Sequence, residues 1–281
     1  MVKNAVCGVE SAFHLAPSLG KKLSIRPFIN VSIGMRGDPH IRKAILDAKK
    51  CSCCGTCIAV CLQKAISAEI KLNEKRCIGC GECAKVCPVN AISFFDKRHV
   101  LNQILPECLR QGVETFELHA IIPDDEAVMA DWQLMNIILK NNYISMCLDR
   151  LQLSDDHLIR RIRAAYQLTG DRFIVQADGI PMSGGADDYN TTLQAVAISD
   201  VIRKSGIPVM ILASGGTNSK TGELAKICGV KVNGVSIGTF ARKIVSTYIE
   251  DKQFETNLAL IRAAVDIAEA LVNINLEQIS G

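Results

Sequence analysis

From about residue 97 onward, segments with helical spacing of apolar residues alternate with short runs that are apolar at nearly every position. Such runs are typical of parallel strands buried on both faces, and their alternation with helices predicts repeated βα units around a parallel sheet. Asp124 is a suitable N-cap for one of the helices, because acidic residues follow it. The expected strands are 115–121, 143–148, 173–177, 209–213 and 232–237, and the expected helices are 99–111, 124–140, 155–168, 191–204 and 220–228, with further helical segments after Thr239.

One more strand is expected ahead of these units, at 28–33, where a short apolar run lies between Pro27 and Gly34. It brings the number of expected strands to six, whereas a (β/α)8 barrel has eight strands and typically about 250 residues. Without the cysteine-rich segment 37–95, the chain has 222 residues. We therefore predict an α/β fold, a TIM-barrel-like parallel βα repeat that lacks its first two βα units. An open doubly wound sheet is the alternative.

The cysteine-rich segment contains two runs with the spacing C-x2-C-x2-C-x3-C. They begin twenty-six residues apart, and Ala65-Ile66-Ser67 recurs as Ala91-Ile92-Ser93, so the segment contains an internal repeat. This is the ligand spacing of ferredoxins with two [4Fe–4S] clusters, in which the fourth cysteine of each run ligates the other cluster. We predict that cluster 1 is held by Cys51, Cys54, Cys57 and Cys87, and cluster 2 by Cys77, Cys80, Cys83 and Cys61.

Zinc sites and disulfides explain these cysteines less well. Zinc sites with paired C-x2-C motifs give no role to the C-x3-C cysteines. Disulfides need an oxidising compartment, and residues 1–22 lack the features of a secretory signal or a transit peptide. Five of the thirteen cysteines lie outside the two ligand sets. Cys53 is expected to be a passenger in the first ligand loop, and the others to be buried small hydrophobic residues: Cys7, Cys108, Cys147 and Cys228.

Composition limits the classes of function. A chain of 281 residues with 48% hydrophobic residues can bury a substantial core. A net charge of +3 gives no reason to expect nucleic acid as a partner, and no apolar run is long enough to span a bilayer. The expected domains are an N-terminal segment with the first strand (1–36), the ferredoxin-type module (37–96), the α/β domain (97–250) and a C-terminal helical tail (251–281).

Two glycine-rich loops follow the last expected strands, where barrels commonly bind phosphate. Glycines let backbone N–H groups approach an anion, a helix N-terminus adds its dipole, and an arginine can bind bidentately. FMN or another phosphate ligand is therefore a possible occupant, although such glycines also form ordinary βα turns. The candidate ligand-binding residues in these loops are Ser214, Gly215, Gly216, Thr217, Asn218, Gly238 and Arg242.

A third candidate stretch, 176–185, places Asp178 at the carboxyl end of a strand, followed by Ser183 and Gly184 in a polar loop. His119 and Asp149 are also expected at strand carboxyl ends. Taken singly, each is more often a cap or turn residue. Together with Asp178 they would form an acid–base pocket if the fold brings them together.

The stretches 31–44, 176–184, 214–218 and 234–243, together with both cysteine runs, resemble in the same order the light-dependent period protein (LdpA) family of cyanobacteria and other photosynthetic organisms. The resemblance covers roughly residues 27–248. It implies an iron–sulfur protein that senses cellular redox state and adjusts light input to the circadian clock, associated with clock proteins rather than with a defined reaction. The sequence departs from the family in three ways. The family's first cysteine cluster is looser and Pro-rich, whereas Cys51–Cys61 has regular ferredoxin spacing. The family's N-terminal βα region is largely absent here, and residues after about Ser246 have no counterpart in the family.

Three functions follow from these features. The first is a redox-sensing regulator, with a ferredoxin or the quinone pool as redox partner and with regulatory proteins as further partners. The alternative is an iron–sulfur oxidoreductase that passes electrons to a flavin or phosphate-containing ligand at the βα loops. Simple electron carriage leaves about two-thirds of the chain without a role. The expected location is the cytoplasm, or the plastid stroma if the source is a plant or alga.

Overall fold

The computed structural model of the protein describes residues 2–23, 25–35, 38, 41–74, 76–77, 79–96, 100–179 and 186–279. The chain divides into two compact units. One is the cysteine-rich module, Ile33–Val100, and the other combines Met1–Ser32 with Leu101–Gly281. Each unit is described separately below.

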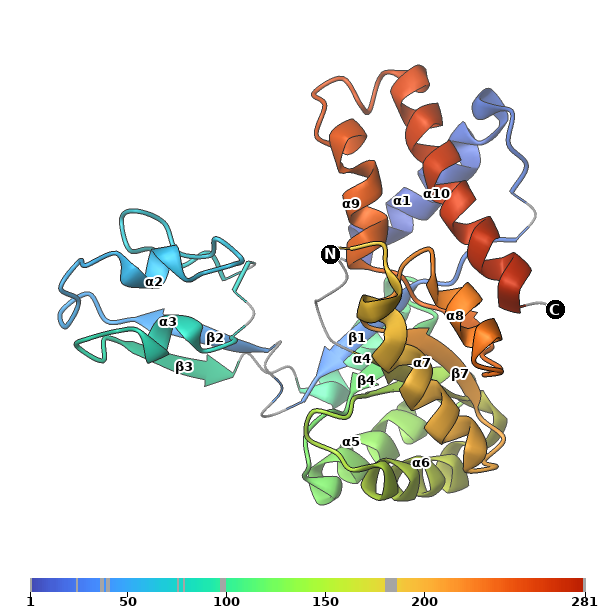
Figure 1. Ribbon diagram of the computed structural model, residues 1–281, viewed down its shortest axis with the longest axis horizontal. Coiled ribbons are helices and arrows are strands. Elements are labelled where there is room, and N and C mark those ends of the chain that lie inside the picture. The colour runs from blue at the N-terminus through green and yellow to red at the C-terminus, as the bar shows by residue number, and fades with distance from the viewer. Residues whose placement is uncertain are drawn as a thin grey trace. The chain divides into compact units, whose positions relative to one another are not determined.

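The larger unit, which we call the α/β unit, is organised around a central sheet (Figure 1). Its six strands lie in the order β1-β4-β5-β6-β7-β8. The pairs from β4 to β8 are all parallel. β1 also runs parallel to β4, because Ile29, Asn30 and Ser32 each contact a residue that lies 85 positions further along the chain. The strands are β1 (Asn30–Gly34), β4 (Thr115–His119), β5 (Ile144–Leu148), β6 (Phe173–Asp178), β7 (Met210–Ser214) and β8 (Gly234–Val235).

The strand order follows the chain without a reversal. In a doubly wound sheet the strand order reverses at a switch point. The alternative of an open doubly wound sheet is therefore wrong for the strands described here. The prediction of a mixed α/β fold with a parallel sheet is confirmed. Asp124 caps α5 as predicted, because its side chain accepts a hydrogen bond from the backbone N–H of Ala127 (3.0 Å). The helices between the strands are α4 (Leu101–Arg110), α5 (Asp125–Ile138), α6 (Asp155–Thr169), α7 (Tyr189–Lys204) and α8 (Thr221–Ile227).

The two faces of the sheet differ in chemistry. One face packs against the helices and is apolar; Phe173 on this face meets Trp132 of α5 edge to face, with ring centroids 5.0 Å apart. The opposite face carries polar side chains that are nevertheless buried, each no more than 9% exposed. We call this second surface the polar face, and its members are Glu117, His119, Ser145, Cys147, Gln176, Asp178 and Ser214.

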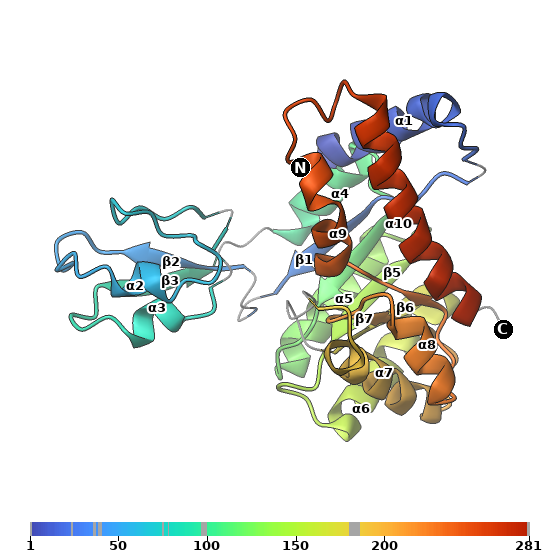
Figure 2. The ribbon, with the colours of Figure 1, turned by 45° about the horizontal axis from the view of Figure 1, so that its top comes forward.

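Terminal helices complete the α/β unit: α1 (Val2–Leu15), α9 (Thr239–Ile249) and α10 (Leu258–Ile279). α10 packs along α8 and α9 (Figure 2). Lys21 ties the segment after α1 to α10 through Asp266 (2.9 Å) and Glu269 (2.5 Å). Among the described residues, no helix is both long and apolar enough to cross a bilayer.

The cysteine-rich module is an insertion in the connection from β1 to α4. Its first and last strands, β2 (Arg42–Leu46) and β3 (Ile92–Asp96), pair with each other in antiparallel fashion. Between them lie two single-turn helices, α2 (Thr56–Ala59) and α3 (Glu82–Lys85). Because β2 pairs with β3, the first and last strands of the module are adjacent. The module can therefore be inserted in a single connection of the α/β unit.

Candidate functional sites

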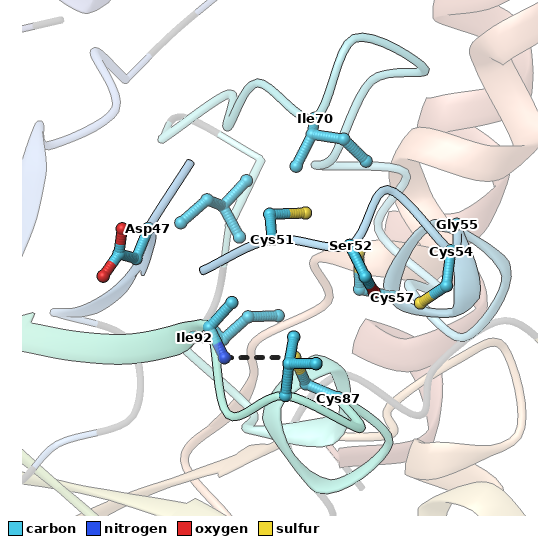
Figure 3. Close-up of a pocket in the computed structure, with 12 residues that line it drawn as sticks. Asp47, Cys51, Ser52, Cys54, Gly55, Cys57, Ile70, Cys87 and Ile92 are labelled. Carbon is cyan, nitrogen blue, oxygen red and sulfur yellow. Dashed lines mark hydrogen bonds between the residues drawn. The ribbon is translucent and has the colours of Figure 1, made fainter. Parts of the chain in front are cut away.

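Two cavities in the cysteine-rich module are each lined by four cysteines. In both, three of the cysteines belong to one run and the fourth belongs to the other run. Figure 3 shows the first cavity, with Cys87 approaching the loop that carries the other three. The cavities are lined by the two quartets that the spacing predicts: Cys51, Cys54, Cys57 and Cys87 in one, and Cys61, Cys77, Cys80 and Cys83 in the other.

The electrostatics of each quartet favour a bound cation. Burial raises the pKa of Cys57, and the nearby thiols of Cys51, Cys54 and Cys87 raise it further. Burial likewise raises the pKa of Cys83, with added contributions from Cys80, Cys77 and Cys61. Four thiolates this close repel one another, so they ionise together only when positive charge is placed between them. The donor set therefore fits a metal cluster with sulfur ligands.

The backbone around the two quartets is alike. Residues with left-handed φ occur at equivalent positions, twenty-six residues apart: Gly55 and Gly81 (+75° and +91°), and Lys64 and Asn90 (+48° and +49°). A third such pair is Cys53 and Gly79 (+55° and +66°).

The fourth cysteine of each run also has an equivalent hydrogen bond. The backbone N–H of Ala65 donates to Cys61 Sγ (3.3 Å), and that of Ala91 donates to Cys87 Sγ (3.2 Å). Hydrogen bonds to sulfur are one of the factors that set the reduction potential of a cluster.

Cys53 occupies a backbone position that suits glycine. Side chains in the left-handed region cost about 1 kcal/mol or more, and the second run has Gly79 at this point. We expect Cys53→Gly to stabilise the module by roughly 0.5–1 kcal/mol and to leave its iron content unchanged. The measurement is thermal loss of cluster absorbance. Ser52→Gly is the control and should lower the midpoint, because the described left-handed positions do not include Ser52.

The polar face of the α/β unit contains a chain of hydrogen bonds across four strands. Ser32 Oγ donates to Glu117 Oε1 (2.7 Å), and Gln176 Nε2 donates both to Glu117 and to Ser145 Oγ (3.1 Å for the latter). These bonds satisfy both carboxylate oxygens of Glu117. They hold β1, β4, β5 and β6 together through side chains as well as through the sheet.

Closer to the carboxyl ends of the strands, His119, Cys147 and Asp178 meet. One potential ligand atom from each lies within 4.8 Å of the other two. Cys147 Sγ donates to Asp178 Oδ2 (3.4 Å), and burial raises the pKa of both side chains, for Cys147 well above its usual value. Asp149 lies near enough to raise the pKa of Asp178 further. The structure therefore brings together the three strand-end residues His119, Asp149 and Asp178.

The sequence interpretation missed Cys147 as part of this group. Of the four cysteines expected to be buried and apolar, Cys108 is buried, whereas Cys7 and Cys228 are exposed, so the expectation is wrong for those two. Cys147 is buried, but its neighbours are polar. The available indication was polarity at every second position of otherwise apolar strands, as in Ser145, Cys147 and Asp149.

The loop after β7 contacts Asp178 directly, but its Asn218 side chain is engaged in hydrogen bonds within the protein. Asn218 is fully buried, and its Nδ2 donates to Ala186 O (3.1 Å), Asp188 O (2.7 Å) and Thr191 Oγ1 (2.8 Å). Asn218 thus fixes the start of α7. Gly215 lies against the Asp178 carboxylate, whereas Ser183 and Gly184 lie outside the described residues.

The two candidate phosphate loops adjoin each other. Thr217 Oγ1 donates to Ser236 O (2.5 Å), which places the loop after β7 beside the loop after β8. Arg242 is exposed on α9 and lies over Gly238, its Nη2 3.4 Å from Thr239 Oγ1. Gly216 belongs to the loop after β7, and Ser214, the last residue of β7, is buried on the polar face.

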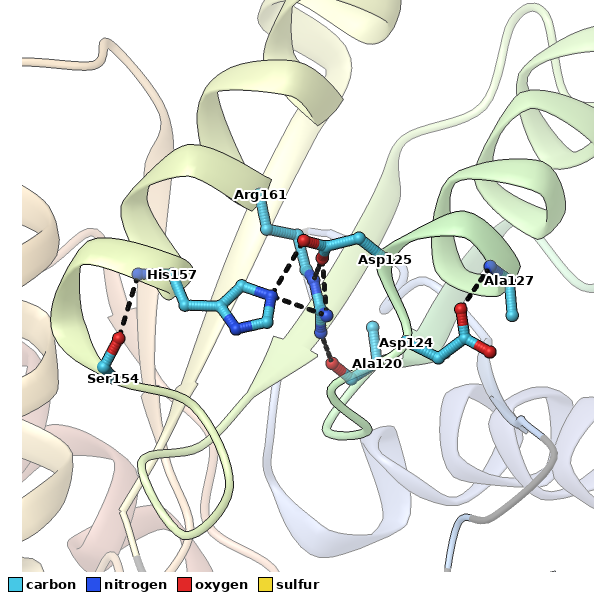
Figure 4. A network of polar contacts seen from close by, with 7 residues as sticks. All are labelled: Ala120, Asp124, Asp125, Ala127, Ser154, His157 and Arg161. Atoms are coloured by element: carbon cyan, nitrogen blue, oxygen red, sulfur yellow. Dashed lines mark hydrogen bonds and ion pairs between the residues drawn. The ribbon is translucent and has the colours of Figure 1, made fainter.

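A buried arginine links two helices at the carboxyl end of β4 (Figure 4). The side chain of Arg161 is 0% exposed; it donates to Asp125 Oδ1 (2.7 Å) and to Ala120 O (2.6 Å). His157 Nε2 lies 2.8 Å from the other carboxylate oxygen. Burial alone would raise the pKa of Asp125, but the hydrogen bonds from His157 and Arg161 outweigh it and lower this pKa below its usual value.

We expect Asp125→Asn to lower the free energy of unfolding by about 2 kcal/mol at neutral pH, because Arg161 loses its anionic partner. Since the pKa of Asp125 is lowered in the folded state, the stabilisation is complete above about pH 4 and is lost as the pH falls through the folded pKa. The difference between the two proteins should therefore shrink in acid. Urea unfolding at several pH values measures it, with Asp156→Asn as an exposed control on α6. A pH-independent difference would contradict the explanation.

Family models match part of each unit. The profile described as the light dependent period A C-terminal domain matches residues 108–274, more than half of the chain. The profile of the 4Fe-4S binding domain matches residues 70–93. The first match continues through most of α10, so the expectation that residues after about Ser246 have no counterpart in the family is wrong.

No curated protein matches the chain. Among solved structures, the chain is similar to the YdjI aldolase from Escherichia coli K12, with a TM-score of 0.41 and 13% sequence identity. The similarity covers 63% of this chain, and the chain spans 63% of the length of the aldolase.

Proposed function

Because the chain belongs to the light dependent period A family and carries a 4Fe-4S binding domain, we propose that it binds two [4Fe–4S] clusters and acts as a redox-sensing regulatory protein. The observation that carries the proposal is the pair of cavities, each lined by one cysteine quartet. The first cluster would be held by Cys51, Cys54, Cys57 and Cys87, and the second by Cys61, Cys77, Cys80 and Cys83. Each bound cluster would take up and release one electron at a time.

Iron content tests the ligand assignment. After anaerobic reconstitution, the wild-type chain should hold about eight irons, and Cys57→Ala or Cys83→Ala should each hold about four. Both cysteines are buried at equivalent positions of the two runs, so the substitutions are matched. An unchanged iron content in either variant would reject the assignment.

The exposure of the cysteines supports electron exchange with a partner. Cys54 and Cys80, which occupy the same position in the two runs, are exposed, whereas Cys57 and Cys83 are buried. Each cluster would thus have one edge near solvent and one edge inside the module. A ferredoxin or the quinone pool is the proposed redox partner, in the cytoplasm or in a plastid stroma.

The family relationship supports a regulatory output, namely the adjustment of light or redox input to the circadian clock through contacts with regulatory proteins. A sensor must change its surface when its redox state changes. Hydrogen exchange of the oxidised and dithionite-reduced protein should therefore differ in the module's exposed loops. Identical exchange in both states would contradict redox sensing.

We also infer that the α/β unit is of the barrel type. Sequential parallel strands without a reversal and a buried polar face opposite the helices both support this.

An iron–sulfur oxidoreductase is the second candidate, favoured by the contact between the β7 and β8 loops at Thr217 and Ser236. Asn218 and Thr217 are engaged within the protein, so a phosphate would rely on backbone N–H groups and on Arg242. Saturable FMN binding that Arg242→Ala weakens would support this function. An absence of FMN and phosphate binding would reject it.

A further inference from the structure

The polar face carries three side chains of types that can ligate a metal ion, and the proposed clusters do not use them. His119 comes from β4, Cys147 from β5 and Asp178 from β6, and their exposed fractions are 7%, 3% and 6%. One ligand atom of each lies within 4.8 Å of the other two. We propose that His119, Cys147 and Asp178 bind one zinc ion.

One of the three distances between the ligand atoms already has the length that a zinc site requires. With bond lengths of about 2.0 Å to nitrogen or oxygen and about 2.3 Å to sulfur, the edges of a tetrahedral site measure about 3.5 Å. The Cys147 Sγ to Asp178 Oδ2 distance is 3.4 Å. Imidazole, thiolate and carboxylate are all established zinc ligands. Three protein ligands leave a fourth position for water or for an oxygen of a substrate, the arrangement of catalytic zinc sites.

The surroundings of Asp178 independently indicate a cation. Its Oδ2 accepts from Cys147, but its buried Oδ1 has no hydrogen-bond partner among the described residues. A buried carboxylate oxygen without a partner is costly. The backbone nevertheless makes room for it, because a Cβ atom on Gly215 would lie 1.6 Å from Oδ1. A zinc ion would compensate the charge that this packing buries.

The charge on the sheet points the same way. Glu117 and Asp178 lie on the polar face, and Asp149 follows β5 at its end. None of the six strands contains a lysine or an arginine. A divalent ion would offset this excess of negative charge.

Zinc binding involves a proton at Cys147. The thiol that donates to Asp178 in the metal-free protein would lose its proton to solvent as the zinc–sulfur bond forms. No change of oxidation state is needed. The site thus requires only zinc and a path for one proton.

The test uses the whole 281-residue chain with its clusters reconstituted anaerobically, after which zinc sulfate is the only metal added. After dialysis, we expect about one zinc per chain with unchanged iron. X-ray absorption at the zinc edge should show one sulfur and two or three nitrogen or oxygen neighbours. Cys147→Ser and Asp178→Asn should each weaken zinc binding by at least about tenfold without loss of iron. Cys108→Ser, a buried cysteine on α4, is the matched control and should bind zinc like the wild type.

A shell of four sulfurs would place the zinc on the cysteine runs and overturn the proposal. Zinc binding that is absent in the wild type, or unchanged in Asp178→Asn, would also overturn it. If Cys147→Ser does not fold, the Asp178→Asn affinity and the wild-type coordination shell still decide the question.

Discussion

Replacing Cys61 and Cys83 together with alanine should leave about four irons per chain, whereas replacing Cys61 and Cys57 should leave almost none. Cys61 is in the same run as Cys57, but it lines the cavity that contains Cys83. The first double substitution removes two ligands from one proposed cluster. The second removes one ligand from each, so neither cluster keeps its full set of thiolates.

Double substitutions that include Cys87 test in the same way whether the fourth cysteine of the second run ligates the first cluster. Cys87→Ala with Cys57→Ala should leave about four irons, and Cys87→Ala with Cys83→Ala almost none. Iron and acid-labile sulfide per chain are the measurements, and far-UV circular dichroism verifies that the chain is folded. Substituting Cys7 and Cys228, which are exposed and lie outside both quartets, is the control and should leave iron content unchanged. The opposite pattern would mean that each run ligates its own cluster.

The grouping of the cysteines into the two quartets that line the cavities could be predicted, because the spacing within each run is a local pattern and the same spacing occurs twice in the chain. The alternation of helices and strands after residue 100 could also be predicted, since each element has its own apolar pattern and Asp124 its own capping geometry. These features depend on residues that are close in sequence.

The N-terminal region was harder to predict. α1 was not expected, although Val2, Val6, Val9 and Phe13 recur at helical spacing and are half-buried in the structure. The first strand was expected at 28–33 but extends over Asn30–Gly34. Its limits depend on pairing with β4, which lies 85 residues away and cannot be inferred from local composition.

The polar face illustrates a further limit. His119 and Asp178 could be predicted as site residues because they lie at the carboxyl ends of strands. Cys147 could not, because its position beside them depends on the strand register, in which it lies opposite His119. Asn218 shows the converse. A polar residue in a glycine-rich loop resembles a ligand-binding residue, yet its amide binds backbone carbonyl groups that only the tertiary fold brings near.

Gly215→Ala should destabilise the α/β unit by about 3 kcal/mol or more, the second large effect that we expect. Its φ of +67° lies in the left-handed region, which contributes about 1 kcal/mol for alanine. The larger part comes from contact: the new Cβ would lie 1.6 Å from Asp178 Oδ1 and 2.9 Å from the backbone nitrogen of Gly179. The buried carboxylate would have to move into a packed region.

Gly229→Ala separates the two causes, because Gly229 has nearly the same φ (+66°) and nothing within 4 Å of an added Cβ. It should cost only about 1 kcal/mol. Urea unfolding followed by fluorescence of Trp132, the single tryptophan and fully buried in this unit, gives both values. In an Asp178→Ala background, Gly215→Ala should cost much less than in the wild type, since the clashing oxygen is gone. Equal costs in the two backgrounds would show that Gly215 is required by its backbone conformation rather than by the position of Asp178.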